Sequence, residues 1–196
     1  MKIIVNASNI YIGGGLQVSL SFIHELKYIK AEHEYHIFIS PAIKRQVNQD
    51  LFPLNIKFYL IESSASKIFS RRNVVSCMDK LLLKINPDLV FTVFGPSYWR
   101  PKITHLSGFA DGWVYNPSTI AYSRLSFFNK IKRQFLSRYK LYFLKNNSDY
   151  FVLETQDAAN KLSNVAKINT NIFFVIGNTY GSVFCDNSLL DVTNEH

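Results

Sequence analysis

The chain has 196 residues, of which 47% are hydrophobic and 15% aromatic, so it can bury the core of one domain. Its formal net charge of +8 favours an anionic partner such as a membrane surface, a phosphorylated substrate or nucleic acid, without choosing among them. Two distant cysteines, five histidines without metal-ligand spacing, and no apolar run near the roughly 20 residues of a membrane span argue against a disulfide framework, a structural metal and an integral membrane protein.

The N-terminal stretch predicts a strand, a loop and a helix. Ile3–Val5 is a short apolar run, and three consecutive glycines, Gly13, Gly14 and Gly15, open a periodic apolar segment. Its apolar positions recur every three or four residues, which predicts a helix that packs on a sheet through Leu16, Leu20, Ile23 and Leu26. Consecutive glycines permit positive φ, and the helix N-terminus offers N–H groups to an anion or a hydroxyl. The glycines therefore indicate either a binding loop or a tight turn that needs small residues.

Two familiar phosphate-binding loops do not fit this stretch. The dinucleotide fingerprint requires a third glycine where Val18 stands and an acidic residue near the end of the second strand, where Ile39 and Ser40 stand. A Walker A loop requires a lysine beside the glycines, and Leu16-Gln17-Val18 supplies none. Nicotinamide binding and P-loop nucleotide hydrolysis are therefore not expected.

The remaining elements alternate along the chain. Apolar runs predict strands at 35–39, 56–61, 88–94, 103–106, 150–153 and 172–176. Helical spacing and stop signals predict helices at 42–51, 66–85, 118–144 and 156–163. This alternation predicts an α/β fold, Rossmann-like, with a mostly parallel sheet and helices on both faces. We assign the domain to residues 1–178 and expect 179–196 to be a linker or the start of a further domain.

The loops after the predicted strands are the expected binding site, because ligands of parallel sheets bind at the carboxyl ends of the strands. We predict that substrate contacts come from Gly13, Gly14, Gly15, Leu16, Gly95, Pro96, Gly108, Trp113, Glu154 and Thr155. The last two residues have a structural alternative, in which Thr155 caps a helix and Glu154 is solvated.

Asp111 is the candidate catalytic residue of these loops. It lies among the aromatic residues Phe109, Trp113 and Tyr115, where a carboxylate can accept a hydrogen bond from a ligand hydroxyl while a ring stacks on the ligand. A general base in this position suits a substrate hydroxyl. The alternative is that Asp111-Gly112 is a turn and that Trp113 belongs to the core.

A cationic helix is predicted in the second half of the chain. The segment from Arg124 to Lys145 contains seven basic residues and no acidic residue. The apolar residues recur at helical spacing, at Phe128, Ile131, Phe135, Tyr139 and Tyr142, and the basic residues roughly opposite are Lys130, Arg133 and Lys140. These three are the predicted contacts with an anionic membrane surface. The alternative is a solvated helix whose apolar stripe packs on the sheet; no nucleic-acid-binding motif is present.

Taken together, several segments resemble the N-terminal domain of GT-B glycosyltransferases of the family 4 type, common in bacterial polysaccharide assembly. They are the N-terminal strand, the glycine loop that opens a helix, Asp88–Thr92 before Gly95-Pro96, and Val175-Ile-Gly-Asn178-Thr179. The resemblance implies two Rossmann-like domains around a cleft, with the acceptor bound mainly by this half and the nucleotide-sugar mainly by the other. It places the glycines near the donor phosphates and implies transfer with retention.

This sequence departs from the family pattern in two ways. The second domain with its paired glutamates is absent, so we expect the isolated chain to be inactive. Many relatives place a histidine after the strand that matches Ile103–Leu106, where this chain has the loop with Asp111.

The expected function is therefore the acceptor-side domain of a glycosyltransferase that acts in bacterial surface glycan biosynthesis, including lipopolysaccharide. The expected partners are a nucleotide-sugar donor, a glycan or lipid-linked acceptor and an anionic membrane surface, without nucleic acid, metal or cofactor. The expected location is the cytoplasm or the inner face of the membrane. The alternative is a non-catalytic module that binds a glycan or a partner, or an inactive fragment.

Overall fold

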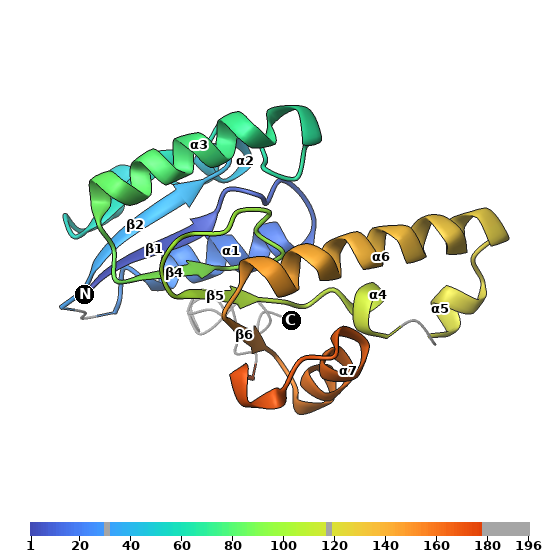
Figure 1. The fold of residues 1–196 in the computed structure, drawn as a ribbon. Helices are drawn as coiled ribbons and strands as arrows, with labels where there is room; N and C mark the ends of the chain where they lie inside the picture. Colours follow the sequence, from blue (N-terminus) through green and yellow to red (C-terminus); the bar gives the residue numbers. More distant parts are fainter. Residues whose placement is uncertain (30–31, 117–118, 178–196) are drawn as a thin grey trace, which may run out of the picture.

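The computed structural model describes residues 1–29, 32–116 and 119–177, which form one parallel sheet with helices around it. The seven strands have the order β3-β2-β1-β4-β5-β6-β7, and each neighbouring pair is parallel (Figure 1). Their bounds are Lys2–Ala7 (β1), Glu34–Ile39 (β2), Ile56–Leu60 (β3), Leu89–Thr92 (β4), His105–Gly108 (β5), Tyr150–Leu153 (β6) and Phe173–Val175 (β7). The predicted α/β, Rossmann-like fold is confirmed.

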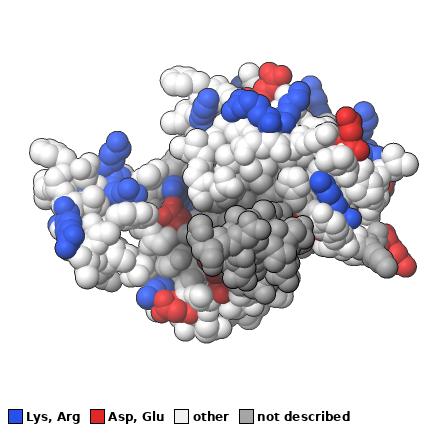
Figure 2. Space-filling view, turned by 180° about the vertical axis from the view of Figure 1, so that it is seen from behind, with Lys and Arg blue, Asp and Glu red and all other residues white. Residues whose placement is uncertain are grey.

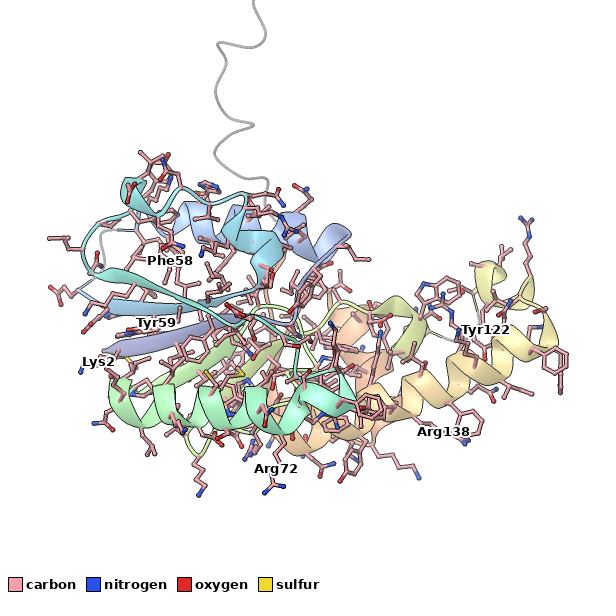
Figure 3. All side chains as sticks on the ribbon, turned by 90° about the horizontal axis from the view of Figure 1, so that it is seen from above. Lys2, Phe58, Tyr59, Arg72, Tyr122 and Arg138 are labelled. Carbon is pink, nitrogen blue, oxygen red and sulfur yellow. The ribbon has the colours of Figure 1, made fainter. Side chains whose placement is uncertain are left out.

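The helices lie on both faces of the sheet. Two of them, α1 (Gly14–Glu25) and α2 (Pro41–Lys44), cover one face, and α3 (Ile68–Ile85) and α6 (Phe127–Asn147) cover the other (Figure 3). The remaining helical segments are α4 (Gly112–Tyr115), α5 (Ile120–Ser123), α7 (Gln156–Ala166) and the short 3-10 turns η1 (Gln49–Leu51) and η2 (Thr170–Ile172). In Figure 1 the N-terminal half of α6 extends beyond the sheet, and the helix begins beside α5.

Alternating side chains of β1 supply the cores of both faces. Val5 packs in the cluster that contains the residues of α1, and Ile4 packs in the cluster that contains Met78 of α3. The helix face predicted for α1 is confirmed, because its four apolar residues are buried: Leu16, Leu20, Ile23 and Leu26. The sheet is thus fixed between two apolar layers, which leaves its carboxyl edge for the loops.

Two predicted helices are each divided in the structure. The helix predicted at 118–144 is α5 followed by α6, because Thr119 caps α5 and the chain leaves helical geometry at Ser126 before α6 begins. The helix predicted at 42–51 is α2 followed by η1, which starts anew where Asn48 Oδ1 accepts the N–H of Asp50 at 3.2 Å. Strand β5 also begins at His105, two residues later than the predicted bound.

The predicted linker at 179–196, together with Asn178, lies outside the described residues, as does Ser118 at the start of the predicted long helix. Within the described ranges no helix combines the length and the apolar character needed to cross a bilayer.

Candidate functional site

A cavity of about 930 Å³ lies at the carboxyl edge of the sheet. Its walls are formed by the loops that follow β1, β4, β5 and β6 and by one side chain of α6. β1 and β4 are neighbours, and the strand order reverses between them. A parallel sheet opens a crevice at such a reversal, and ligands bind there. The volume is that of an ordinary small-molecule site.

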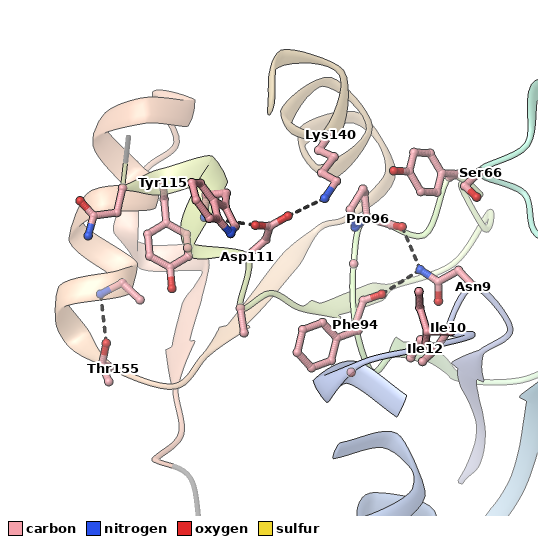
Figure 4. A pocket seen from close by; sticks show the side chains of 18 of the residues that line it. Asn9, Ile10, Ile12, Ser66, Phe94, Pro96, Asp111, Tyr115, Lys140 and Thr155 are labelled. Atoms are coloured by element: carbon pink, nitrogen blue, oxygen red, sulfur yellow. Dashed lines mark hydrogen bonds and ion pairs between the residues drawn. The ribbon is translucent and has the colours of Figure 1, made fainter. Parts of the chain in front are cut away.

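Asn9 connects the two loops at this reversal. Its side-chain amide donates to the carbonyl oxygens of Phe94, at 2.9 Å, and Pro96, at 3.1 Å (Figure 4). These two bonds hold the loop after β1 against the loop after β4, and both loops line the cavity. Gly95 and Pro96, predicted as substrate contacts, therefore belong to a wall whose position is fixed by an amide.

Asp111 lies in the cavity wall with both carboxylate oxygens bonded. Oδ1 accepts the backbone N–H of Trp113 at 3.2 Å, which caps α4, and Oδ2 lies 2.5 Å from Nζ of Lys140 on α6 (Figure 4). The side chains are 21% and 26% exposed, so this ion pair is partly shielded from water. The carboxylate therefore caps α4, which agrees with the alternative of a turn at Asp111-Gly112. It also lies at the cavity. Each oxygen keeps a lone pair that a ligand hydroxyl can meet.

Trp113 also lines the cavity, and a second cation of α6 lies over its ring. The guanidinium carbon of Arg133 is 4.1 Å from the centre of the Trp113 ring, a cation–π contact. Trp113 is half-buried, so the alternative that it is a core residue is wrong.

The predicted orientation of the cationic helix is wrong. Lys130, Arg133 and Lys140 are half-buried, and Arg133 and Lys140 point toward α4 and the cavity through the contacts given above. The apolar stripe, which packs on the sheet in the alternative of a solvated helix, is largely exposed. An ion pair and a cation–π contact with the loop after β5 hold the basic face inward, and neither contact can be read from the spacing within one helix.

The glycine loop divides into residues with different roles. Gly13 has a φ of 78°, which favours glycine, whereas Gly14 and Gly15 begin α1 with ordinary helical backbone. Gly15 lines the cavity, where an added Cβ would lie 3.7 Å from the Phe94 ring. Leu16 is buried in the core, so its assignment as a substrate contact is wrong.

Three further predicted substrate contacts do not all line the main cavity: Gly108, Glu154 and Thr155. A Cβ on Gly108 would lie 2.3 Å from the carbonyl oxygen of Val93, so this glycine is needed where β4 and β5 end side by side. Gly108 and Glu154 line a second cavity of about 550 Å³ beside α1 and not the main one. Thr155 accepts the N–H of Ala158 at 3.1 Å, which confirms the helix cap, and it lines the main cavity as well.

The structure adds cavity residues that the sequence reasoning missed. The first is Asp157, in the first turn of α7, whose carboxylate lies 2.7 Å from Lys161. Other wall residues come from the loops after β1 and β4 and from the segment before α3: Asn9, Tyr11, Tyr98 and Ser66. Burial raises the pKa of Tyr98 to about 12, so its hydroxyl stays protonated at neutral pH. Asn9 and Tyr11 directly follow the first predicted strand, and that position alone is a signal that could have found them.

A buried network of polar side chains connects three of the strands whose loops form the cavity. The Asn6 amide donates to Thr92 Oγ1 at 3.2 Å, Thr92 Oγ1 lies 2.8 Å from His105 Nε2, and His105 Nδ1 contacts the Asn147 carbonyl. A carbonyl oxygen only accepts, so Nδ1 carries the proton and Nε2 accepts from Thr92. Burial lowers the pKa of His105 to about 4, which keeps the ring neutral. The network joins β1, β4 and β5 to the end of α6 and so helps fix the helix that carries Lys140.

Within the described ranges, no group of three or more His, Cys, Asp or Glu side chains is placed to hold a metal ion.

No protein-family model matches the sequence, and no curated protein matches it. The structure is similar to a glycosyltransferase from Rickettsia africae, with a TM-score of 0.56 and 14% identity over 98% of this chain and 46% of that chain. It is also similar to the UDP-GlcNAc 2-epimerase of Methanocaldococcus jannaschii, with a TM-score of 0.53 and 20% identity over 90% of this chain and 45% of that chain.

A third similar structure is UGT2 of Phytolacca americana in complex with UDP-2fluoro-glucose and pterostilbene, with a TM-score of 0.54 and 9% identity over 94% of this chain and 55% of that chain. The chain therefore spans about half the length of these solved structures. At such identities the likeness concerns the fold. The chain has the Rossmann-like fold of one half of GT-B-type glycosyltransferases and sugar epimerases.

Proposed function

We propose that this chain is the acceptor-side half of a glycosyltransferase that uses a nucleotide-sugar donor. The observation that carries the proposal is the cavity at the strand-order reversal, because it combines an aromatic ring, Trp113, with a carboxylate held by a lysine, Asp111 and Lys140. Aromatic rings stack on the apolar faces of sugars, and a carboxylate accepts hydrogen bonds from their hydroxyls. The fold shared with glycosyltransferases supports the same assignment.

Asp111 would act on the acceptor hydroxyl. In transfer with retention, the bond from the anomeric carbon of the donor to the nucleotide phosphate breaks, and the acceptor oxygen bonds to that carbon on the same face of the sugar. Asp111 orients the hydroxyl and takes up its proton as a general base. Lys140 holds the carboxylate in place, and the first turn of α1 at Gly15 borders the space in which donor phosphates would lie.

The finer assignments belong to the same proposal. We place the chain with the family 4 type, acting with retention on a lipid-linked or polysaccharide acceptor in bacterial surface glycan biosynthesis. The enzyme would work in the cytoplasm at the inner face of the membrane. A non-catalytic module that binds a glycan remains the alternative function.

The test is a screen of the protein as its gene encodes it against UDP-, GDP- and ADP-sugars, with and without a lipid extract or oligosaccharide acceptor. Release of nucleoside diphosphate that requires the acceptor, together with a labelled product, is the expected result. Release without an acceptor and with a changed free sugar would assign an epimerase instead. Glycan binding without any release of nucleotide would assign the binding module and contradict the proposal.

A further inference from the structure

The outward side of α6 carries a stripe of large apolar side chains. Phe128, Phe135 and Tyr142 are 82%, 67% and 63% exposed, and Ile131 lies between the first two. Their spacing of three, four and seven residues places them along one line of the helix. Phe127 at the start of α6 and Ile120 of α5 are also exposed. A contiguous exposed apolar surface of this kind marks an interaction site.

Basic residues flank this stripe on both sides. Lys132 lies on one side, and Arg138 and Lys145 lie on the other; all three are exposed. The chain has no Asp or Glu between Asp111 and Asp149. Figure 3 shows Arg138 pointing outward on the same side as Arg72 of α3. Figure 2, which views the molecule from behind, shows Lys and Arg without Asp or Glu toward the end of the projecting helix on that side as well.

These residues form what we call the outer face of α6: Phe128, Ile131, Lys132, Phe135, Arg138 and Tyr142. The opposite side of the helix is occupied, because Lys140 pairs with Asp111, Arg133 stacks on Trp113 and Leu144 is fully buried. The helix therefore cannot turn its apolar stripe inward without breaking these contacts. Among the described residues, none covers the outer face.

We propose that the outer face of α6 docks on an anionic lipid surface. A helix with an apolar stripe between cations suits the interface between acyl chains and headgroups, where rings insert and Lys and Arg meet lipid phosphates. A second copy of this chain would bring cations against cations, so self-association is disfavoured. The proposal goes beyond sugar transfer and does not depend on it.

The same helix would then serve two surfaces. Its outer face would contact lipid. On its inner face, Lys140 lies in the cavity wall and Arg133 lies over the ring of Trp113. A substrate anchored in the bilayer would reach the cavity around the free end of the helix.

The experiment is co-sedimentation of the 196-residue chain with vesicles of phosphatidylcholine alone or mixed with phosphatidylglycerol. Two variants test the outer face: Phe128→Ser with Phe135→Ser, and Lys132→Glu with Arg138→Glu. Each pair is expected to lower the partition coefficient on anionic vesicles at least tenfold. Added salt should weaken the binding of the unaltered chain, because the headgroup attraction is screened.

Matched controls lie away from α6, in the loop before β3 and at the end of α2. Leu54→Ser removes an apolar side chain that is 95% exposed, and Lys44→Glu with Arg45→Glu reverses two exposed charges. These variants should bind as the unaltered chain does, and circular dichroism checks that every variant is folded. If the unaltered chain ignores anionic vesicles at low salt, or if the controls lose as much binding as the test variants, the proposal is wrong. Dimerisation in the absence of lipid that Phe128→Ser with Phe135→Ser abolishes would assign the face to a second copy instead.

Discussion

Asp111 joins the loop after β5 to the long helix α6, since one oxygen caps α4 and the other pairs with Lys140. A carboxylate bonded in this way has a fixed direction and is not free to rotate. A substrate hydroxyl would therefore meet an acceptor that is already oriented, which is what a general base requires.

Asp111→Asn in the protein as encoded should lower sugar transfer by about 10² to 10⁴-fold, because the amide cannot take up a proton. The melting temperature should change little, since a partly exposed ion pair contributes only about 1 kcal/mol or less. Asp157→Asn is the matched control, because Asp157 lines the same cavity but pairs with Lys161 of its own helix. Equal losses in the two variants would show that Asp111 acts only through the charge of the cavity.

His105 makes the fold sensitive to acid. The unfolded chain binds a proton on this ring near pH 6.5, whereas the buried ring binds one only near pH 4. Between these values the unfolded state holds more protons, so the free energy of unfolding falls as the pH falls through this window. From roughly 1.4 kcal/mol per pKa unit, the loss due to His105 is about 3 kcal/mol at most.

His105→Gln should flatten this dependence, although it lowers the stability at pH 7 because the network loses its ring. The measurement is urea unfolding at pH values from 7 to 4, with His33→Gln before β2 as the control. A His105→Gln protein that loses as much stability over this range as the unaltered chain would show that other groups cause the acid sensitivity.

At the scale of elements, the ends of β4 and β5 are packed backbone to backbone. Gly108 permits this approach, and the Gly95 N–H donates to the Gly108 carbonyl at 2.7 Å. The loops that carry Pro96 and Asp111 leave the sheet from this junction, so its geometry sets the distance between two walls of the cavity.

Gly108→Ala should lower the free energy of unfolding by about 2 to 3 kcal/mol, because the new Cβ would meet the Val93 carbonyl and the backbone must shift. Gly112→Ala is the matched control, since no described atom lies within 4 Å of a Cβ added there. It should change stability by about 0.5 kcal/mol or less. Thermal and urea unfolding of both variants test this, and a Gly108→Ala protein as stable as the control would contradict the assigned role.

Helix α6 shows what the sequence could and could not predict. Helical spacing correctly groups Phe128 with Phe135 and Lys130 with Arg133, because the helix period alone determines which residues share a face. Which face turns inward depends on contacts with residues far along the chain, and here Asp111 and Trp113 bind the cations and turn the apolar stripe outward.

At the scale of the whole molecule, the ends of the strands were predicted to within two residues, because apolar runs between Gly, Pro and polar residues determine them locally. The main cavity lies at the edge of the sheet where the site was predicted. The separate roles of Gly108 and Glu154 could not be predicted, since they depend on which loops lie side by side.

The position of β1 has a consequence for the order of events during synthesis. β1 is made first but lies inside the sheet, paired with β2 on one side and with β4 on the other. A nascent chain can pair the first side once β2 has left the ribosome, whereas the second side stays open until Leu89–Thr92 has emerged. An open strand edge is a template for wrong pairing, and long-range parallel pairing is slow. During synthesis, the free edge of β1 is therefore exposed to wrong pairing until β4 arrives.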